Sequence, residues 1–278
     1  MTRRKVIQRW AWSAMGVAAG AAALALSAGA CSSETAGETI SFSAGIAGAT
    51  ESGAAPGQEF VTYAGWRVQV SKALIAAGPI YYYAGQPQAR WYEGLLGIRT
   101  AHACPTHAQY DKGTVLGEVV QQFAVDLTGA PLQMGTFDGV AGTCQSVELH
   151  LHPPGALGAS SGGNSLAPLE GYTVILEGTA SKDAVTRPFR AKLSLPDEGL
   201  MRIVEGIPAS VPMQDVADKP GFVLVEVLVD QWLSTVDFET LTDKDGDTYL
   251  FTESTQAWTS LIRGIRAKQS YRVAWRSE

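Results

Sequence analysis

Short segments in which apolar and polar residues alternate run through most of the chain, and this pattern restricts the fold more than any other feature. Alternation places successive side chains on opposite faces of a β-strand. Gly, Pro, Asp or Asn residues follow each segment and mark turns. The segments are EFVTYA (59–64), GWRVQVSKALIAA (65–77), GPIYYYAG (78–85), GEVVQQFAVDL (117–127), SVELHLH (146–152), YTVILEGTA (172–180), FRAKLSL (189–195), LMRIVEGI (200–207) and GFVLVEVLVD (221–230). Many short strands of this kind predict an all-β chain folded as an antiparallel β-sandwich.

Helical patterning is confined to the C-terminal part of the chain. The segment DQWLSTVDFETL (230–241) predicts one short helix. A second is predicted in ESTQAWTSLIRGIRAK (253–268), where apolar residues fall near helical spacing and Glu253 stands at the start. We therefore expect a sandwich of immunoglobulin-like or jelly-roll-like type with one or two short helices near the C-terminus. The intervening DKDGDT (243–248) resembles the start of a calcium loop but lacks the distal glutamate, and it is also typical of an ordinary turn.

The first thirty residues have the order of a secretion signal. A cationic stretch, MTRRKVIQRW, precedes an apolar stretch rich in Ala and Gly and a small-residue region, SAGAC, that ends at Cys31. SAGAC resembles the lipobox of bacterial lipoproteins, although Ala28 stands where that motif usually has Leu. We therefore expect residues 1–30 to be a signal peptide and Cys31 to carry lipid. TRRKVIQ also resembles a twin-arginine motif, so Sec and twin-arginine export both stay open.

Removal of the signal changes the charge of the protein. It takes away four basic residues and no acidic ones, which leaves 17 basic against 27 acidic residues, a net charge of −10. An acidic surface argues against binding to nucleic acid or to anionic head groups. The lipid on Cys31 would then be the membrane anchor. Residues 31–58, rich in Ser, Gly, Ala and Thr, predict a flexible tether with room for one strand at TISFSAGI, and residues 59–278 predict a single domain.

With Cys31 assigned to lipid, two of the three cysteines remain, Cys104 and Cys144. In an oxidising envelope compartment such a pair predicts a disulfide. The alternative is that both are thiolate ligands of a metal ion.

The four histidines form two pairs, and each pair lies within a few residues of one of these cysteines. His102 and His107 flank Cys104 in AHACPTHAQY, and His150 and His152 follow Cys144 in CQSVELHLHPP. A disulfide would draw the pairs toward one place, and imidazole is the commonest protein ligand for copper and zinc. The sequence therefore predicts a metal site made of all four histidines.

Strand alternation adds detail to the second pair. In SVELHLH, Val147, Leu149 and Leu151 would face the core, while Glu148, His150 and His152 would share the opposite face. Glu148 is then placed to be a further ligand. Alternatively, Glu148 lies outside the ligand shell and accepts a hydrogen bond from an imidazole ligand. The alternative is an exposed polar stripe with no bound metal.

Several stretches together carry a family resemblance: GWRVQVSKALIAAGPIYYY, AHACPTHAQYDKGTVLGE, GTFDGVAG, ELHLHPP, EGTASKD and STQAWTSLIRGI. In their order they resemble lipoproteins of Gram-negative bacteria and are similar to the methanobactin-associated, MbnP-like copper-binding proteins. The resemblance implies an exported β-rich protein that handles copper through histidine and modified tryptophan. No tryptophan of this chain is assigned to a family position, so none is included among the expected metal ligands.

Two classes of function follow from the sequence. The first is an envelope lipoprotein, anchored in the outer membrane and facing the periplasm or the exterior, that binds copper or zinc for capture, storage or transfer. Its partners would be the membrane and a metal-delivery or outer-membrane transport protein. The second is a metal-free structural or ligand-binding lipoprotein with incidental histidines. Catalysis is not expected, because an enzyme would need a placed acid or base, and Glu118 and Glu148 are the nearby candidates, with neither one assigned.

Overall fold

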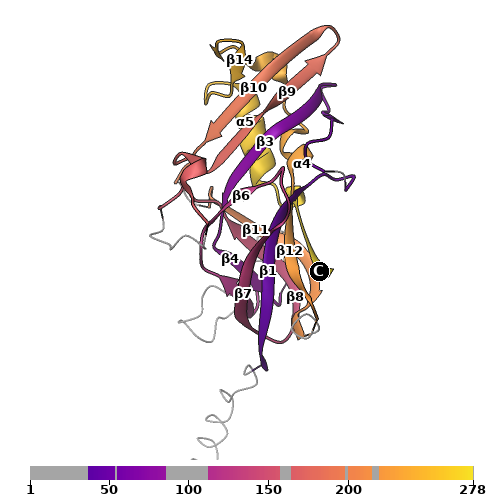
Figure 1. Ribbon diagram of the computed structural model, residues 1–278, viewed down its shortest axis with the longest axis vertical. Helices are drawn as coiled ribbons and strands as arrows, with labels where there is room; N and C mark the ends of the chain where they lie inside the picture. The colour runs from indigo at the N-terminus through magenta and orange to yellow at the C-terminus, as the bar shows by residue number, and fades with distance from the viewer. Residues whose placement is uncertain are drawn as a thin grey trace, which may run out of the picture. The chain divides into compact units, whose positions relative to one another are not determined.

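The computed structural model describes residues 37–53, 55–85, 112–156, 164–197, 200–214 and 219–277 (Figure 1). The chain divides into two units, Met1–Glu38 and Thr39–Glu278. Nearly all of the first unit, with the predicted signal peptide and Cys31, lies outside the described residues, as do His102, Cys104 and His107. The fold described below is that of the second unit.

Two β-sheets make up most of this unit, so the all-β prediction is confirmed. The eight-stranded sheet has the order β11 (Ile203–Pro212), β8 (Thr143–His150), β4 (Ile80–Tyr83), β5 (Val115–Val119), β7 (Leu132–Val140), β1 (Thr39–Ala49), β12 (Gly221–Leu228) and β15 (Tyr271–Ser277). Its two outer strands, β11 and β15, also lie side by side, so the sheet is nearly closed. The seven-stranded sheet has the order β13 (Lys244–Asp245), β14 (Thr248–Leu250), β10 (Val185–Leu193), β9 (Val174–Lys182), β3 (Arg67–Ala77) and β2 (Phe60–Val61), with β6 (Phe123–Asp126) also paired to β3.

The sheets are mixed rather than purely antiparallel, which corrects part of the prediction. β1 runs parallel to β12, and β10 runs parallel to β14. Both pairs join strands that are distant in sequence, so no hairpin sets their direction. Alternation within one strand carries no information about the direction of its neighbour, and the sequence pattern therefore could not reveal these pairs.

A hydrophobic core cluster contains side chains from both sheets. Phe42, Tyr82 and Leu149 of the eight-stranded sheet belong to the same buried cluster as Val68 and Phe189 of the seven-stranded sheet. Burial of this kind is the main favourable contribution to folding.

The strand that TISFSAGI suggested within the predicted tether is β1, a central strand of the eight-stranded sheet. β1 pairs with β7 on one side and with β12 on the other, so the folded unit starts at Thr39 rather than at Glu59. The small residues that suggest a linker are needed for close packing. A Cβ atom on Gly48 would lie 1.9 Å from the carbonyl oxygen of Leu127, and one on Gly45 would lie 2.6 Å from the Phe222 ring.

Both predicted helices are present but shorter than their segments. α4 spans Val229–Leu233 and is followed by the 3-10 turn η4 (Phe238–Thr240). α5 spans Gln256–Arg266, and the side chain of its N-cap residue, Thr255, accepts a hydrogen bond from the backbone of Trp258 at 3.2 Å. The two helices pack together, with Gly264 of α5 against Trp232 of α4 (Figure 1). Further 3-10 turns are η3 (Ala167–Leu169) and η5 (Lys268–Ser270).

The DKDGDT segment forms a β-hairpin. β13 and β14 pair through Asp245 and Thr248, and Gly246 occupies the left-handed region at a φ of 60°. Gly246 and Asp247 form the two-residue loop, and glycine at the first loop position favours such a turn because it tolerates positive φ. The turn interpretation of this segment is therefore confirmed.

Candidate metal centre

Strand β8 presents its side chains as the alternation predicts. Val147, Leu149 and Leu151 are fully buried in the core. Glu148 contacts His150, and His150 contacts His152, which places the three side chains together on the other face. These three residues are called the β8 cluster below.

The end of β8 is held by backbone contacts. The backbone N–H of His150 donates to the carbonyl of Pro79, and the side-chain amide of Gln122 donates to the carbonyl of His152 at 2.6 Å. Gln122 is itself buried, so this hydrogen bond is shielded from water. Pro153 and Pro154 follow directly and cannot donate to a sheet partner. The two histidines therefore lie where the strand ends, on a backbone that is fixed from both sides.

Glu148 is the best-anchored member of the β8 cluster. Its Oε1 lies 2.7 Å from Nε2 of His150, and its Oε2 pairs with the ammonium group of Lys112. Lys112 also donates to Glu205 on β11 at 2.7 Å. Burial alone would raise the pKa of Glu148, but the hydrogen bonds from His150 and Lys112 and their charges outweigh it and lower that pKa. Glu148 is therefore a carboxylate that accepts a hydrogen bond from His150.

This contact determines which nitrogen of His150 is available. A carboxylate accepts only from a protonated nitrogen, so Nε2 of His150 carries hydrogen, and Nδ1 is the nitrogen whose lone pair would bind a metal ion. That Nδ1 lies 3.4 Å from Nε2 of His152, and the two rings stack with centroids 5.5 Å apart. Carboxylate–imidazole pairs of this type orient the histidine ligands of metal ions.

His152 is adapted to stay neutral. Burial lowers its pKa, and the charges of His150 and Arg202 lower it further. Its second nitrogen, Nδ1, is buried and has no hydrogen-bond partner within the described part of the chain. A neutral imidazole is the form that binds a metal ion, so the environment of His152 favours the ligand state.

The spacing of the two imidazole nitrogens suits chelation. Two nitrogens that each lie about 2.1 Å from a tetrahedral metal ion are about 3.4 Å apart. The distance from His150 Nδ1 to His152 Nε2 is 3.4 Å. The same distance also permits a direct hydrogen bond between the rings. Among the residues that the structure describes, no group of three or more His, Cys, Asp or Glu is arranged around one point, so the β8 cluster offers two imidazoles and not a complete ligand shell.

Aromatic and acidic neighbours border the β8 cluster on β4 and β5. Tyr81 is paired with Glu148 on one side and with Glu118 on the other, and its ring meets His150 edge-on at 5.5 Å. Burial raises the pKa of Tyr81, as do the charges of Glu118 and Glu148. Glu118 is therefore separated from Glu148 by the intervening strand β4, and it does not join the histidines.

Cys144 lies on the same strand but far from the histidines. Its thiol is fully buried, donates to the carbonyl of Ser146 at 3.4 Å, and has a pKa raised by burial to about 11. Six residues of strand separate it from His150, a distance of about 20 Å. Since Cys104 lies outside the described residues, the disulfide stays a prediction. A bond to Cys144 would not by itself bring His102 and His107 to the β8 cluster.

Sequence reasoning missed the basic partner of the β8 cluster. Lys112 reaches Glu148 from a loop, and Glu205 on β11 accepts from Lys112; both contacts depend on the pairing of β8 with β11 and β4. No local pattern marks either residue.

Comparison with known proteins gives no relative: no family model, no curated protein and no solved structure matches the chain. Within the described segments, no helix combines the length and the apolar character needed to cross a membrane.

Proposed function

We propose that the protein binds a transition metal, copper or zinc, through a histidine cluster in which His150 and His152 are the central ligands. The supporting observation is the 3.4 Å separation of their facing nitrogens, with the other nitrogen of His150 held by Glu148 at 2.7 Å. Glu148 would act outside the ligand shell, and Lys112 would keep it ionised.

His102 and His107 remain the proposed sources of the other ligands. Two imidazoles are fewer than the four ligands typical of structural zinc sites or the three protein ligands of open ones. A site of imidazole without sulfur suits either Cu(II) or Zn(II) by ligand chemistry. Capture, storage or transfer of the ion, without turnover, needs metal ligands but no catalytic group. We therefore propose this role for the site.

Metal analysis of protein purified without a histidine tag tests this function. Protein exposed to excess Zn(II) or Cu(II) and then desalted is expected to retain about one ion per chain, because His150 and His152 are held in place before binding. Elemental mass spectrometry measures the ratio, and a chelator-treated sample is the control. A ratio equal to that of the control for both ions would contradict the proposal.

The second candidate function is a metal-free structural or ligand-binding lipoprotein. It is favoured by the observation that Lys112 and His150 already satisfy the Glu148 carboxylate without a metal ion. Under that alternative the β8 cluster is an internal polar network that fixes the end of the strand.

We also propose that the two sheets form a sandwich of immunoglobulin-like or jelly-roll-like type.

We also propose that the protein is an envelope lipoprotein, anchored through lipid on Cys31 in the outer membrane, with a metal-delivery or transport protein as partner. The support is the order of charged, apolar and small residues before Cys31. The resemblance to MbnP-like copper-binding proteins supports the same compartment.

Replacing Cys31 with alanine is expected to move the protein from the membrane fraction to the soluble envelope fraction, because the acyl chains on this residue would supply the anchor. Fractionation at high salt without detergent, followed by immunoblotting, measures the shift against the wild type. Recovery of the variant in the membrane pellet would contradict lipid anchoring at Cys31.

A further inference from the structure

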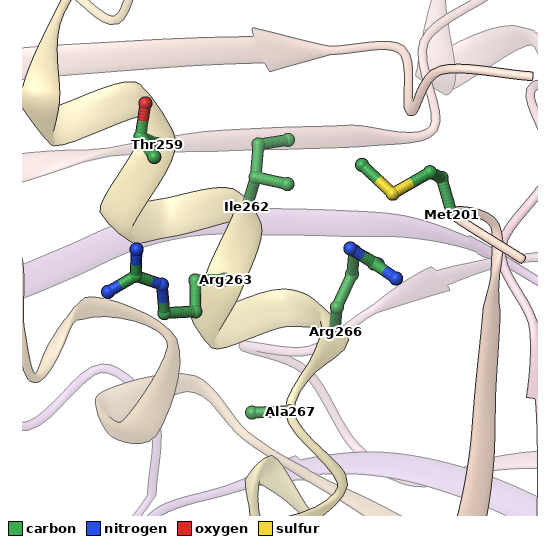
Figure 2. A pocket seen from close by; sticks show the side chains of 6 residues that line it. All are labelled: Met201, Thr259, Ile262, Arg263, Arg266 and Ala267. Atoms are coloured by element: carbon green, nitrogen blue, oxygen red, sulfur yellow. The ribbon is translucent and has the colours of Figure 1, made fainter. Parts of the chain in front are cut away.

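A pocket of about 440 Å³ lies beside the C-terminal half of α5. It is lined by Thr259, Ile262, Arg263, Arg266 and Ala267 of α5 and its C-cap, and by Met201 from the segment before β11. In Figure 2 the side chains of Met201 and Ile262 point toward each other, and the guanidinium of Arg266 lies next to both. We call this the α5 pocket.

The guanidinium groups of the α5 pocket have no acidic partner in the described part of the chain. Other arginines do: Arg202 donates to Asp197 at 2.6 Å, and Arg272 donates to Glu226 at 2.5 Å. By contrast, Nε of Arg266 is buried and makes no hydrogen bond. A buried donor without a partner is costly, and in native proteins such a donor often marks the place of a bound ion or water.

Apart from Thr259, the rest of the lining is apolar. Met201, Ile262 and Ala267 surround the approach to Arg266, and methionine adapts its shape readily to different apolar ligands. A small inorganic anion would leave this surface in contact with water. A ligand with an anionic head and a short hydrocarbon chain would use both halves of the pocket.

We propose that the α5 pocket binds an amphipathic carboxylate of medium chain length. The two carboxylate oxygens accept from the two terminal nitrogens of Arg266, a bidentate arrangement that guanidinium groups allow. The hydrocarbon chain lies on Met201, Ile262 and Ala267, and Arg263 adds positive charge at the rim. The proposal uses no residue of the β8 cluster and does not depend on metal binding.

Titration of the full-length protein with four probes tests the proposal. Octanoate is expected to shift the side-chain Nε–H NMR signal of Arg266 and to give a saturable isotherm by calorimetry. Acetate lacks the chain and octanol lacks the charge, so each is expected to bind at least about tenfold more weakly. Octyl phosphate compares the two anionic head groups, and tighter binding of this probe than of octanoate would overturn the carboxylate assignment.

Two variants locate the site. Arg266→Gln is expected to weaken octanoate binding by about tenfold or more, whereas Arg276→Gln, an exposed arginine outside the pocket, is expected to leave it unchanged. Met201→Glu places a carboxylate beside Arg266 and is expected to block binding even if Arg266→Gln fails to fold. Circular dichroism confirms the fold of each variant. Absence of octanoate binding to the wild type, or equal binding by a folded Arg266→Gln or Met201→Glu variant, would overturn the proposal.

Discussion

Replacing both His150 and His152 with alanine is expected to lower the affinity for Cu(II) and Zn(II) by more than about 100-fold. Removing a residue that only orients a ligand costs up to about 100-fold, and this change removes two ligands. The two facing nitrogens, 3.4 Å apart, would both be lost. Calorimetric titration of each ion into the metal-free wild type and the double variant measures the change. Equal affinity of the two proteins for both ions would remove the β8 cluster from the metal site.

A matched pair of carboxylate variants tests the role given to Glu148. Glu148→Gln is expected to weaken binding by about 10- to 100-fold, because the amide no longer holds His150 as a carboxylate does. Glu177→Gln is the control, since Glu177 also lies on a strand between two basic groups, Lys72 and Arg190, but in the other sheet. Weakening of the same size in both variants would indicate a general loss of stability.

The pH dependence and the remaining histidines complete this experiment. Metal binding should weaken as the pH falls, because protons compete for the ligands. The lowered pKa of His152 means that protons compete at this residue only at a pH below about 6.5, the ordinary histidine value. Truncating His102 in addition to His150 should cost more than either change alone if the two pairs share one ion. If His102→Ala changes the metal affinity neither alone nor in combination with His150→Ala, the site is restricted to β8.

Replacing Phe42 with alanine is expected to destabilise the protein by about 3–5 kcal/mol, the usual cost for a buried phenylalanine. Phe42 lies on β1, is 1% exposed, and meets the ring of Tyr82 edge-on at 5.3 Å. Its ring lies against Gly117 and Gly139, where added Cβ atoms would come within 2.5 Å and 3.1 Å of it. Urea denaturation followed by circular dichroism measures the free energy of unfolding.

The control for this prediction is Ser41→Ala, one residue earlier on the same strand. Ser41 is exposed, so its replacement is expected to change stability by no more than about 0.5 kcal/mol. If Phe42→Ala cost no more than Ser41→Ala, residues 39–49 would behave as the tether that their composition suggests, and β1 would not belong to the core.

Local patterns in the sequence were sufficient for the strand class, the two helices and the common face of Glu148, His150 and His152. These features depend on alternation or helical spacing over a few residues. A strand was expected at residues 39–46, but its central place in the sheet was not, because Gly45 and Gly48 resemble a linker until Phe222 and Leu127 are known to lie against them. The parallel pairs and the contacts of Lys112 and Glu205 were missed because they join distant segments, and a single sequence contains no direct record of such pairings.

The position of β1 in the eight-stranded sheet also determines the order in which the fold can be completed. β1 begins at Thr39, its parallel neighbour β12 begins at Gly221, and the outer strand β15 ends at Ser277. Pairings over such long separations require large loops to close before any contact is gained, which places the protein among slow-folding β-topologies, with times of about milliseconds to seconds. A chain that leaves a ribosome or a translocation channel N-terminus first therefore exposes one edge of β1 until residues 221–228, which form β12, have emerged.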